Sequence, residues 1–139
     1  LVCNTFPWYY HDSIVTGGDN YFHFNHMFYL DGKPNSAYTR LVEPLLKKIK
    51  FKKLLNVRSN LFLRDHVNTV YPKHKDYEYK HKVLLYYVNS TNGGTLLDEK
   101  VTIKCKKNRG LFMDGSIWHS PITQTDTKYR VVVNIGYIE

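Results

Sequence analysis

The sequence predicts an α+β fold that consists mainly of β-strands. From residue 54 onward, short segments rich in Val, Ile, Leu, Phe and Tyr alternate with polar or glycine-containing turns. Two of these segments, residues 83–88 and 131–133, are apolar on both faces, which is typical of the central strands of a sandwich or barrel. No repeat, low-complexity tract or linker divides the 139 residues, so we expect a single domain over residues 1–139.

The first strand is expected near residues 22–30, where the side chains alternate in character. One side carries Phe22, Phe24, Phe28 and Leu30, and the other carries His23, Asn25 and Tyr29. A period of two predicts a half-buried strand. A turn at residues 31–35, which contains Gly32 and Pro34, ends it.

One helix is predicted after this turn, because apolar residues recur there at helical spacing. They are Leu41, Val42, Leu45, Leu46 and Ile49. Pro44 lies inside the pattern, so either the helix kinks there or a new helix begins with Pro in its first turn. The remaining elements are expected to be strands at residues 54–64, 66–71, 82–89, 95–98, 100–105, 110–114 and 128–138.

Net charge and composition limit the possible partners. A net charge of +8 makes nucleic acid a candidate, although the Lys clusters are short. Lys73, Lys75, Lys80 and Lys82 flank the metal residues proposed below and could attract an anion. No apolar run is long enough to span a bilayer. Cys3 and Cys105 could pair only if the fold brought them together, and a reducing cytoplasmic setting is expected.

His74 and Asp76 are the first candidate metal ligands. They stand two apart, and alternate residues of an extended chain project to the same face. His119 would complete one triangular face of an octahedron and leave three positions open, as non-haem iron oxygenases require. Zinc hydrolases usually need only one open position. The doublet alone would also fit an exposed polar loop, so the assignment depends on His119 and on Arg130.

Arg130 stands at the head of an apolar strand, eleven residues after His119. A guanidinium that enters an apolar barrel needs an anionic partner, and a carboxylate of a dicarboxylic cosubstrate could bind it through two hydrogen bonds. The alternative is an Arg at a strand edge that faces water.

The order and spacing of His74, Asp76, His119 and Arg130 resemble those of the iron(II)/2-oxoglutarate-dependent dioxygenases. Within them the sequence is most similar to the prolyl 4-hydroxylase-like branch, which includes small phage-encoded members. The resemblance covers residues 54–139, and the segments 6–9 and 58–61 extend it over the whole chain. It implies a double-stranded β-helix, a jelly-roll barrel with one or two supporting helices and the metal at its mouth.

The resemblance implies roles for individual residues. His74, Asp76 and His119 would hold Fe(II), and Arg130 would pair with the distal carboxylate of 2-oxoglutarate. Tyr87 stands where these hydroxylases often place a phenol beside that carboxylate, with core packing as the alternative role. Asn60 is a further candidate contact, because Phe62 lacks the hydroxyl that many relatives carry nearby. The turn before Thr95, which contains Gly93 and Gly94, is expected to serve a conformational role.

The implied reaction uses Fe(II), 2-oxoglutarate and O2, with ascorbate as an optional reductant. It would hydroxylate an unactivated C–H bond and release succinate and CO2. The branch favours a prolyl residue in a peptide or protein, which a groove formed by the N-terminal segment and Arg58 could hold. A phage-encoded member would act in the host cytoplasm.

Two other functions remain open from the sequence. A nucleic-acid dealkylase of the same superfamily would suit the net charge of +8, but those relatives usually carry a second Arg six residues after the first, and this position is Gly136. A metal-free binding module would keep the same residues for packing alone. The complete set of two histidines, an aspartate and an arginine argues against this module.

Overall fold

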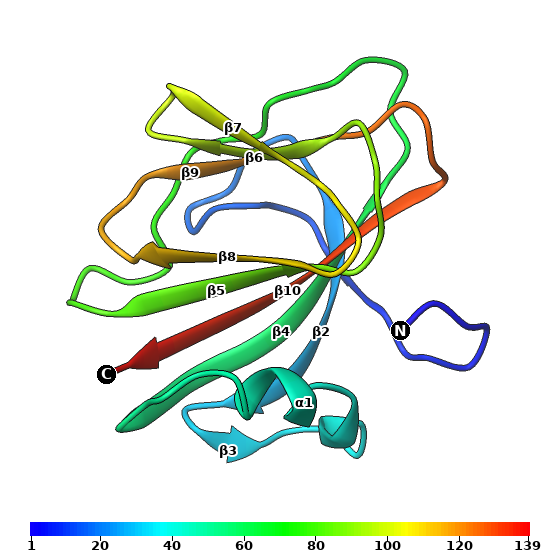
Figure 1. The fold of residues 1–139 in the computed structure, drawn as a ribbon. Coiled ribbons are helices and arrows are strands. Elements are labelled where there is room, and N and C mark those ends of the chain that lie inside the picture. The colour runs from blue at the N-terminus through cyan, green and yellow to red at the C-terminus, as the bar shows by residue number, and fades with distance from the viewer.

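The computed structural model describes residues 1–139 and contains two antiparallel sheets (Figure 1). The larger sheet has seven strands in the order β1-β2-β4-β10-β5-β8, with β3 paired to β2, and the smaller sheet has the order β7-β6-β9. The elements are β1 (Tyr9–His11), β2 (His23–Leu30), β3 (Lys33–Pro34), a 3-10 turn η1 (Thr39–Leu41), α1 (Glu43–Leu46), β4 (Lys53–Leu63), β5 (Lys82–Tyr87), β6 (Gly94–Leu97), β7 (Val101–Lys104), β8 (Arg109–Asp114), β9 (His119–Ile122) and β10 (Tyr129–Ile138). No helix is both long and apolar enough to cross a membrane.

The larger sheet has an apolar layer on each face. One core lies on its outer face, where α1 and the N-terminal segment cover the sheet. This core includes Phe28, Val42, Val133 and Ile135. On its inner face, Phe62, Val83, Leu85 and Val132 belong to a second core that faces the smaller sheet. Because β5 and β10 lie in the middle of the larger sheet and contribute to both layers, the prediction that residues 83–88 and 131–133 form central strands is confirmed.

The helix is shorter than predicted. Residues 39–41 form a 3-10 turn, and α1 begins at Glu43 with Pro44 in its first turn. Pro44 therefore lies in the first turn of a new helix and does not kink a longer one. Its missing N–H costs nothing at that position. Val42 is fully buried between the two pieces.

One strand prediction was wrong, and the strands β1, β3 and β9 were not predicted. Residues 66–71 form no strand, and only Val70 makes a single bridge, to Ile122. The strand β9 was not predicted, because its sequence His-Ser-Pro-Ile contains a proline and has no run of β-branched residues. Pro121 is tolerated there because β9 is an edge strand of the smaller sheet.

The two sides of β2 are oriented differently from the usual apolar-in pattern. His23, Asn25 and Met27 of β2 line the space between the sheets, and Phe28 is buried in the outer core. Leu30 at the end of β2 and Phe22 just before it are 48% and 45% exposed. A register irregularity between Met27 and Tyr29 interrupts the alternation. The inner wall of this part of the barrel is therefore polar, and the polar residues of β2 face a pocket.

Candidate functional site

His74 and His119 are held together by the backbone. Each donates its N–H to the carbonyl of the other at 3.0 Å, although His74 lies in a loop and His119 begins β9. The ring centroids are 4.5 Å apart. One ligand atom from each of His74, Asp76 and His119 lies within 4.8 Å of the other two, so the structure brings the three predicted residues together.

The two imidazoles are oriented for metal binding. The Nδ1–H of His74 donates to the carbonyl of Pro72 at 3.2 Å, and that of His119 donates to Ile117 at 3.3 Å. Each Nε2 then keeps its lone pair. Burial lowers the pKa of both histidines, and for His74 the neighbouring His119 lowers it further. Both rings are therefore neutral at physiological pH, as metal ligation requires.

Asp76 is the anionic member of the triad. Its side chain is only 4% exposed, and burial alone would raise its pKa. Arg58 donates to Oδ1 at 2.9 Å and Asn134 donates to Oδ2 at 3.1 Å, and together with His119 they hold the pKa at about 2. Each oxygen still has a lone pair available for a metal.

The donor set fits ferrous iron. Two neutral imidazoles and one ionised carboxylate are the ligand types of the facial triad, in which the remaining positions stay open. Arg58 and Asn134 orient the carboxylate, which is the usual task of groups around a metal ligand. The sequence suggested a substrate groove for Arg58 and no role for Asn134, because the pairing of Asn134 with Arg58 on neighbouring strands appears only in the structure.

Arg130 lies on β10 with only 1% of its surface exposed. Its Nε donates to Sγ of Cys105 at 3.0 Å, one terminal nitrogen donates to the carbonyl of Gly94 at 2.8 Å, and the guanidinium lies 4.9 Å from the centre of the Phe62 ring. The other terminal nitrogen, Nη1, is buried without a partner, and no Asp or Glu pairs with Arg130. A carboxylate of a ligand would satisfy it, so the site fits 2-oxoglutarate.

The other two candidate contacts differ in their access to the pocket. The Tyr87 hydroxyl is fully buried and donates to Oγ1 of Thr95 at 2.8 Å, and burial raises the pKa of Tyr87. Tyr87 does not line the pocket, but Thr95 does, and it is 3.5 Å from Arg130. Asn60 lines the pocket directly, and its Oδ1 is buried without a partner.

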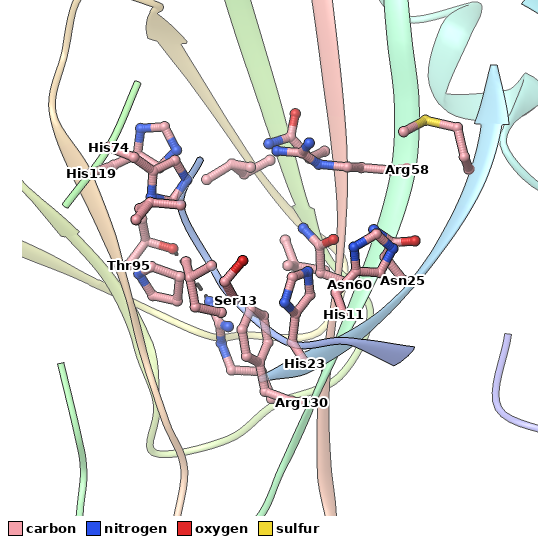
Figure 2. A pocket seen from close by; sticks show the side chains of 18 of the residues that line it. His11, Ser13, His23, Asn25, Arg58, Asn60, His74, Thr95, His119 and Arg130 are labelled. Atoms are coloured by element: carbon pink, nitrogen blue, oxygen red, sulfur yellow. Dashed lines mark hydrogen bonds between the residues drawn. The ribbon is translucent and has the colours of Figure 1, made fainter. Parts of the chain in front are cut away.

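Several of these residues, including His74, His119 and Arg130, line a pocket of about 310 Å³ between the two sheets. Figure 2 shows His74 and His119 on one side, with Asn60, Asn25 and His11 facing them across the space. No Asp or Glu lines the pocket wall, whereas Arg58 and Arg130 both do. The chemistry of the lining therefore favours an anionic ligand.

His23 is a pocket residue that sequence analysis did not assign to the site. Its ring stacks on Phe62, with the centroids 5.6 Å apart, and Phe62 in turn lies against Arg130. Burial, followed by the neighbouring His11, lowers the pKa of His23 to about 4. The alternation in residues 22–30 contains a signal for His23. If the polar side of this strand is assigned to the barrel interior, His23 falls in the site.

The structure is similar to solved structures of oxygenase and cupin proteins. A protein of the 2OG-Fe(II) oxygenase family from Burkholderia pseudomallei has a TM-score of 0.70 and 11% identity, covering 96% of this chain and 74% of that chain. An RmlC-like cupin protein from Desulfovibrio desulfuricans has a TM-score of 0.47 and 15% identity, over 64% of this chain and 88% of that chain. A viral collagen prolyl hydroxylase from Paramecium bursaria Chlorella virus-1 has a TM-score of 0.46 and 12% identity, over 83% and 74% respectively. The last two similarities are too weak to inform the fold or the function.

No family model matches the sequence, and no curated protein is detectably similar to it. The fold is therefore identified by the strand order of the two facing sheets and by the similarity that spans nearly the whole chain. The protein has a mainly β, double-stranded β-helix fold.

Proposed function

We propose that this chain is an Fe(II)- and 2-oxoglutarate-dependent dioxygenase that hydroxylates an unactivated C–H bond and releases succinate and CO2. Arg130 is the observation that carries the proposal. A buried guanidinium lines the same pocket as His74 and His119, whose ligand atoms lie close to that of Asp76, and it has a free nitrogen but no carboxylate partner in the protein. The similarity of the fold to a 2OG-Fe(II) oxygenase family protein is consistent with this function.

The triad would hold the iron. Bound Fe(II) together with 2-oxoglutarate supplies the activation of O2, and ascorbate would serve to keep the iron reduced. His74 and His119 present their Nε2 atoms, and Asp76 contributes the negative charge. Arg58 and Asn134 hold the Asp76 carboxylate in one orientation and so fix the geometry of the triad.

Arg130 would anchor the distal carboxylate of 2-oxoglutarate through Nη1. Thr95 lies next to the guanidinium, and the buried Tyr87 hydroxyl fixes the Thr95 side chain, so Tyr87 would act through Thr95 and not by direct contact. Asn60 can donate from its amide nitrogen to the same cosubstrate. The apolar residues Phe62, Leu85 and Val132 would limit the access of water to the pocket.

The preferred substrate of this proposal is a prolyl residue in a peptide or protein. No Asp or Glu lines the pocket, so a cationic group such as a lysyl side chain would find no counter-ion there. A nucleic-acid substrate is the alternative that the net charge of +8 keeps in view.

The proposal is tested by measuring succinate formed from 2-oxoglutarate under air with added Fe(II). We expect proline-rich peptides to stimulate succinate production by the wild type, and we expect His119→Ala to abolish the activity. His66→Ala is a matched control, because His66 is exposed and lies outside the pocket. Stimulation by methylated oligonucleotides, but not by peptides, would refute the prolyl assignment.

A further inference from the structure

A second cavity adjoins the proposed active site. It measures about 420 Å³, compared with about 310 Å³ for the pocket that His74 and His119 line. The two spaces share the wall residues His11, Asn25 and Met27. A ligand chain could therefore continue from one into the other.

This second cavity has no charged wall residue. Its other lining residues are Pro7, Tyr9, His26, Asn35, Ser36, Ala37 and Tyr38. The chain as a whole is 23% Asp, Glu, Lys and Arg, so the uncharged lining is a local property of this surface. A charged group that entered would lose hydration without gaining a partner. Nucleic acid is disfavoured for the same reason, because its binding depends on Lys or Arg contacts to phosphates.

The polar groups of the cavity are suited to a peptide. The Asn25 amide lies at the junction of the two spaces, is 9% exposed and has no hydrogen-bond partner within the protein. An amide can both donate to and accept from a backbone peptide group. In Figure 2, Asn25 and His11 lie across the pocket from His74 and His119, so a chain that contacts Asn25 would reach the space that these two histidines line.

The aromatic groups offer flat contact surfaces. Tyr9 is 59% exposed on the edge strand β1 and lines the cavity, and Tyr38 lines it while packing edge-on against Phe6 with ring centroids 5.2 Å apart. Exposed tyrosine rings bind apolar and extended chain segments at a low entropy cost. Both ring nitrogens of His26 are satisfied internally, one by the Pro7 carbonyl and the other by the Ser36 hydroxyl, so His26 forms a rigid floor.

We propose that this cavity is a subsite for an uncharged segment of the substrate polypeptide, next to the residue that is oxidised in the adjoining pocket. The inference rests on the proposed function for the position of the reacting residue. It adds a preference for uncharged flanking residues and assigns Tyr9 and Asn25 to substrate recognition. Neither residue contacts the triad or Arg130.

The strand β1 supplies a matched pair of variants for the test. Tyr9 and Tyr10 are 59% and 62% exposed, but Tyr9 pairs with Asn25 and lines the cavity, whereas Tyr10 pairs with Phe24 and packs against Phe22 and Phe24. The probe is a fluorescently labelled, blocked ten-residue peptide of Pro, Ala and Gly, and binding is measured by anisotropy with metal-free protein. We expect Tyr9→Ala to weaken binding by about tenfold, as the loss of one aromatic contact does, and Tyr10→Ala to leave it unchanged.

Two further probes sharpen the test. The same peptide with two lysines or with two glutamates next to its central proline should bind more weakly to the wild type, and Tyr9→Phe should retain wild-type binding of the uncharged peptide. Equal binding by the Tyr9→Ala and Tyr10→Ala proteins would overturn the subsite, as would tighter binding of a charged peptide or of a single-stranded oligonucleotide that Tyr9→Ala weakens. Because this measurement needs neither iron nor 2-oxoglutarate, it gives its result separately from the succinate assay.

Discussion

The Arg130 guanidinium is held in place by contacts that leave one of its nitrogens free. Cys105, the Gly94 carbonyl and the Phe62 ring fix the side chain, and Nη1 stays buried without a partner. A buried charge in this state is costly unless a ligand completes it. We therefore expect Arg130 to raise the affinity for 2-oxoglutarate, the proposed cosubstrate.

Arg130→Met should weaken the binding of 2-oxoglutarate by about 10- to 100-fold, because hydrogen bonds to a charged group contribute about 1.5–3 kcal/mol. Fe(II) binding should persist, since Arg130 does not touch the triad. Isothermal titration of the metal-loaded protein with 2-oxoglutarate in the absence of O2 measures this change. Arg109→Met is the control, because Arg109 is an exposed strand residue outside the pocket. An unchanged dissociation constant in Arg130→Met would remove Arg130 from the site.

Cys105 is a free, buried thiol that accepts the Nε–H of Arg130. Cys105→Ala removes this acceptor, so the guanidinium should become less well oriented and the Kd for 2-oxoglutarate should rise several-fold. Cys105→Ser keeps an acceptor and should fall between the wild type and the Ala variant. The same calorimetric titration checks the order of the three proteins. If Ala and Ser variants bind equally well, Cys105 has only a packing role.

The proposed ligand residues are easier to predict from the sequence than the groups that support them. His74, Asp76, His119 and Arg130 follow from residue type and order, because few side chains can ligate iron or pair with a carboxylate. The roles of Cys105 and of Arg58 depend on which strands become neighbours, and a single sequence does not specify that.

The strand β6 of the smaller sheet is hydrogen-bonded to Arg130 through the backbone of Gly94. A Cβ at Gly94 would lie 2.5 Å from the carbonyl oxygen of Ile103 on the neighbouring β7, and the Gly94 carbonyl accepts from Arg130. The expected conformational role of this glycine turn thus has a specific cause, which is the close approach of two backbones.

Gly94→Ala should lower the free energy of unfolding by about 1–3 kcal/mol, because the added methyl group meets rigid backbone. Gly110→Ala is the matched strand control. Its Cβ would lie 3.2 Å from the end of the flexible Leu84 side chain, which can move, so a smaller loss is expected. Urea denaturation followed by circular dichroism compares the two variants. Equal losses would contradict the backbone clash.

At the level of elements, the strands with strong β-propensity were predictable and the ligand-bearing segments were not. The strands β4, β5, β8 and β10 lie close to their predicted bounds. The segment around His74 makes only isolated bridges, and β9 contains Pro121, so neither has a periodic pattern. Their positions are set by the partner sheet instead of by local preference.

The whole molecule contains several buried or partly buried histidines whose neutral form the fold favours. Burial lowers the pKa of His23, His74 and His119, and that of His23 falls from 6.5 to about 4. The unfolded chain binds protons on these groups at a higher pH than the folded chain does. The contribution of these histidines to stability is therefore fully present above pH 6.5 and is lost as the pH falls, down to about pH 4 for His23.

Metal-free protein should show this loss of stability in urea titrations between pH 7 and pH 4. The pKa of His23 alone corresponds to about 3 kcal/mol of unfolding free energy across that window. His23→Gln should flatten the pH dependence by that amount, while His66→Gln, at an exposed position, should not. A pH profile identical in wild type and His23→Gln would contradict the assignment of a neutral His23 in the folded protein.

The central claim is that the triad and Arg130 bind iron and 2-oxoglutarate together in one pocket. The most direct measurement is an anaerobic titration of Fe(II) and then 2-oxoglutarate into the apoprotein, followed by visible absorption. The wild type should develop a metal-to-cosubstrate charge-transfer band that needs both additions, and the double variant His74→Ala with Asp76→Ala should develop none. The absence of a band in the wild type, or an unchanged band in the double variant, would contradict the claim.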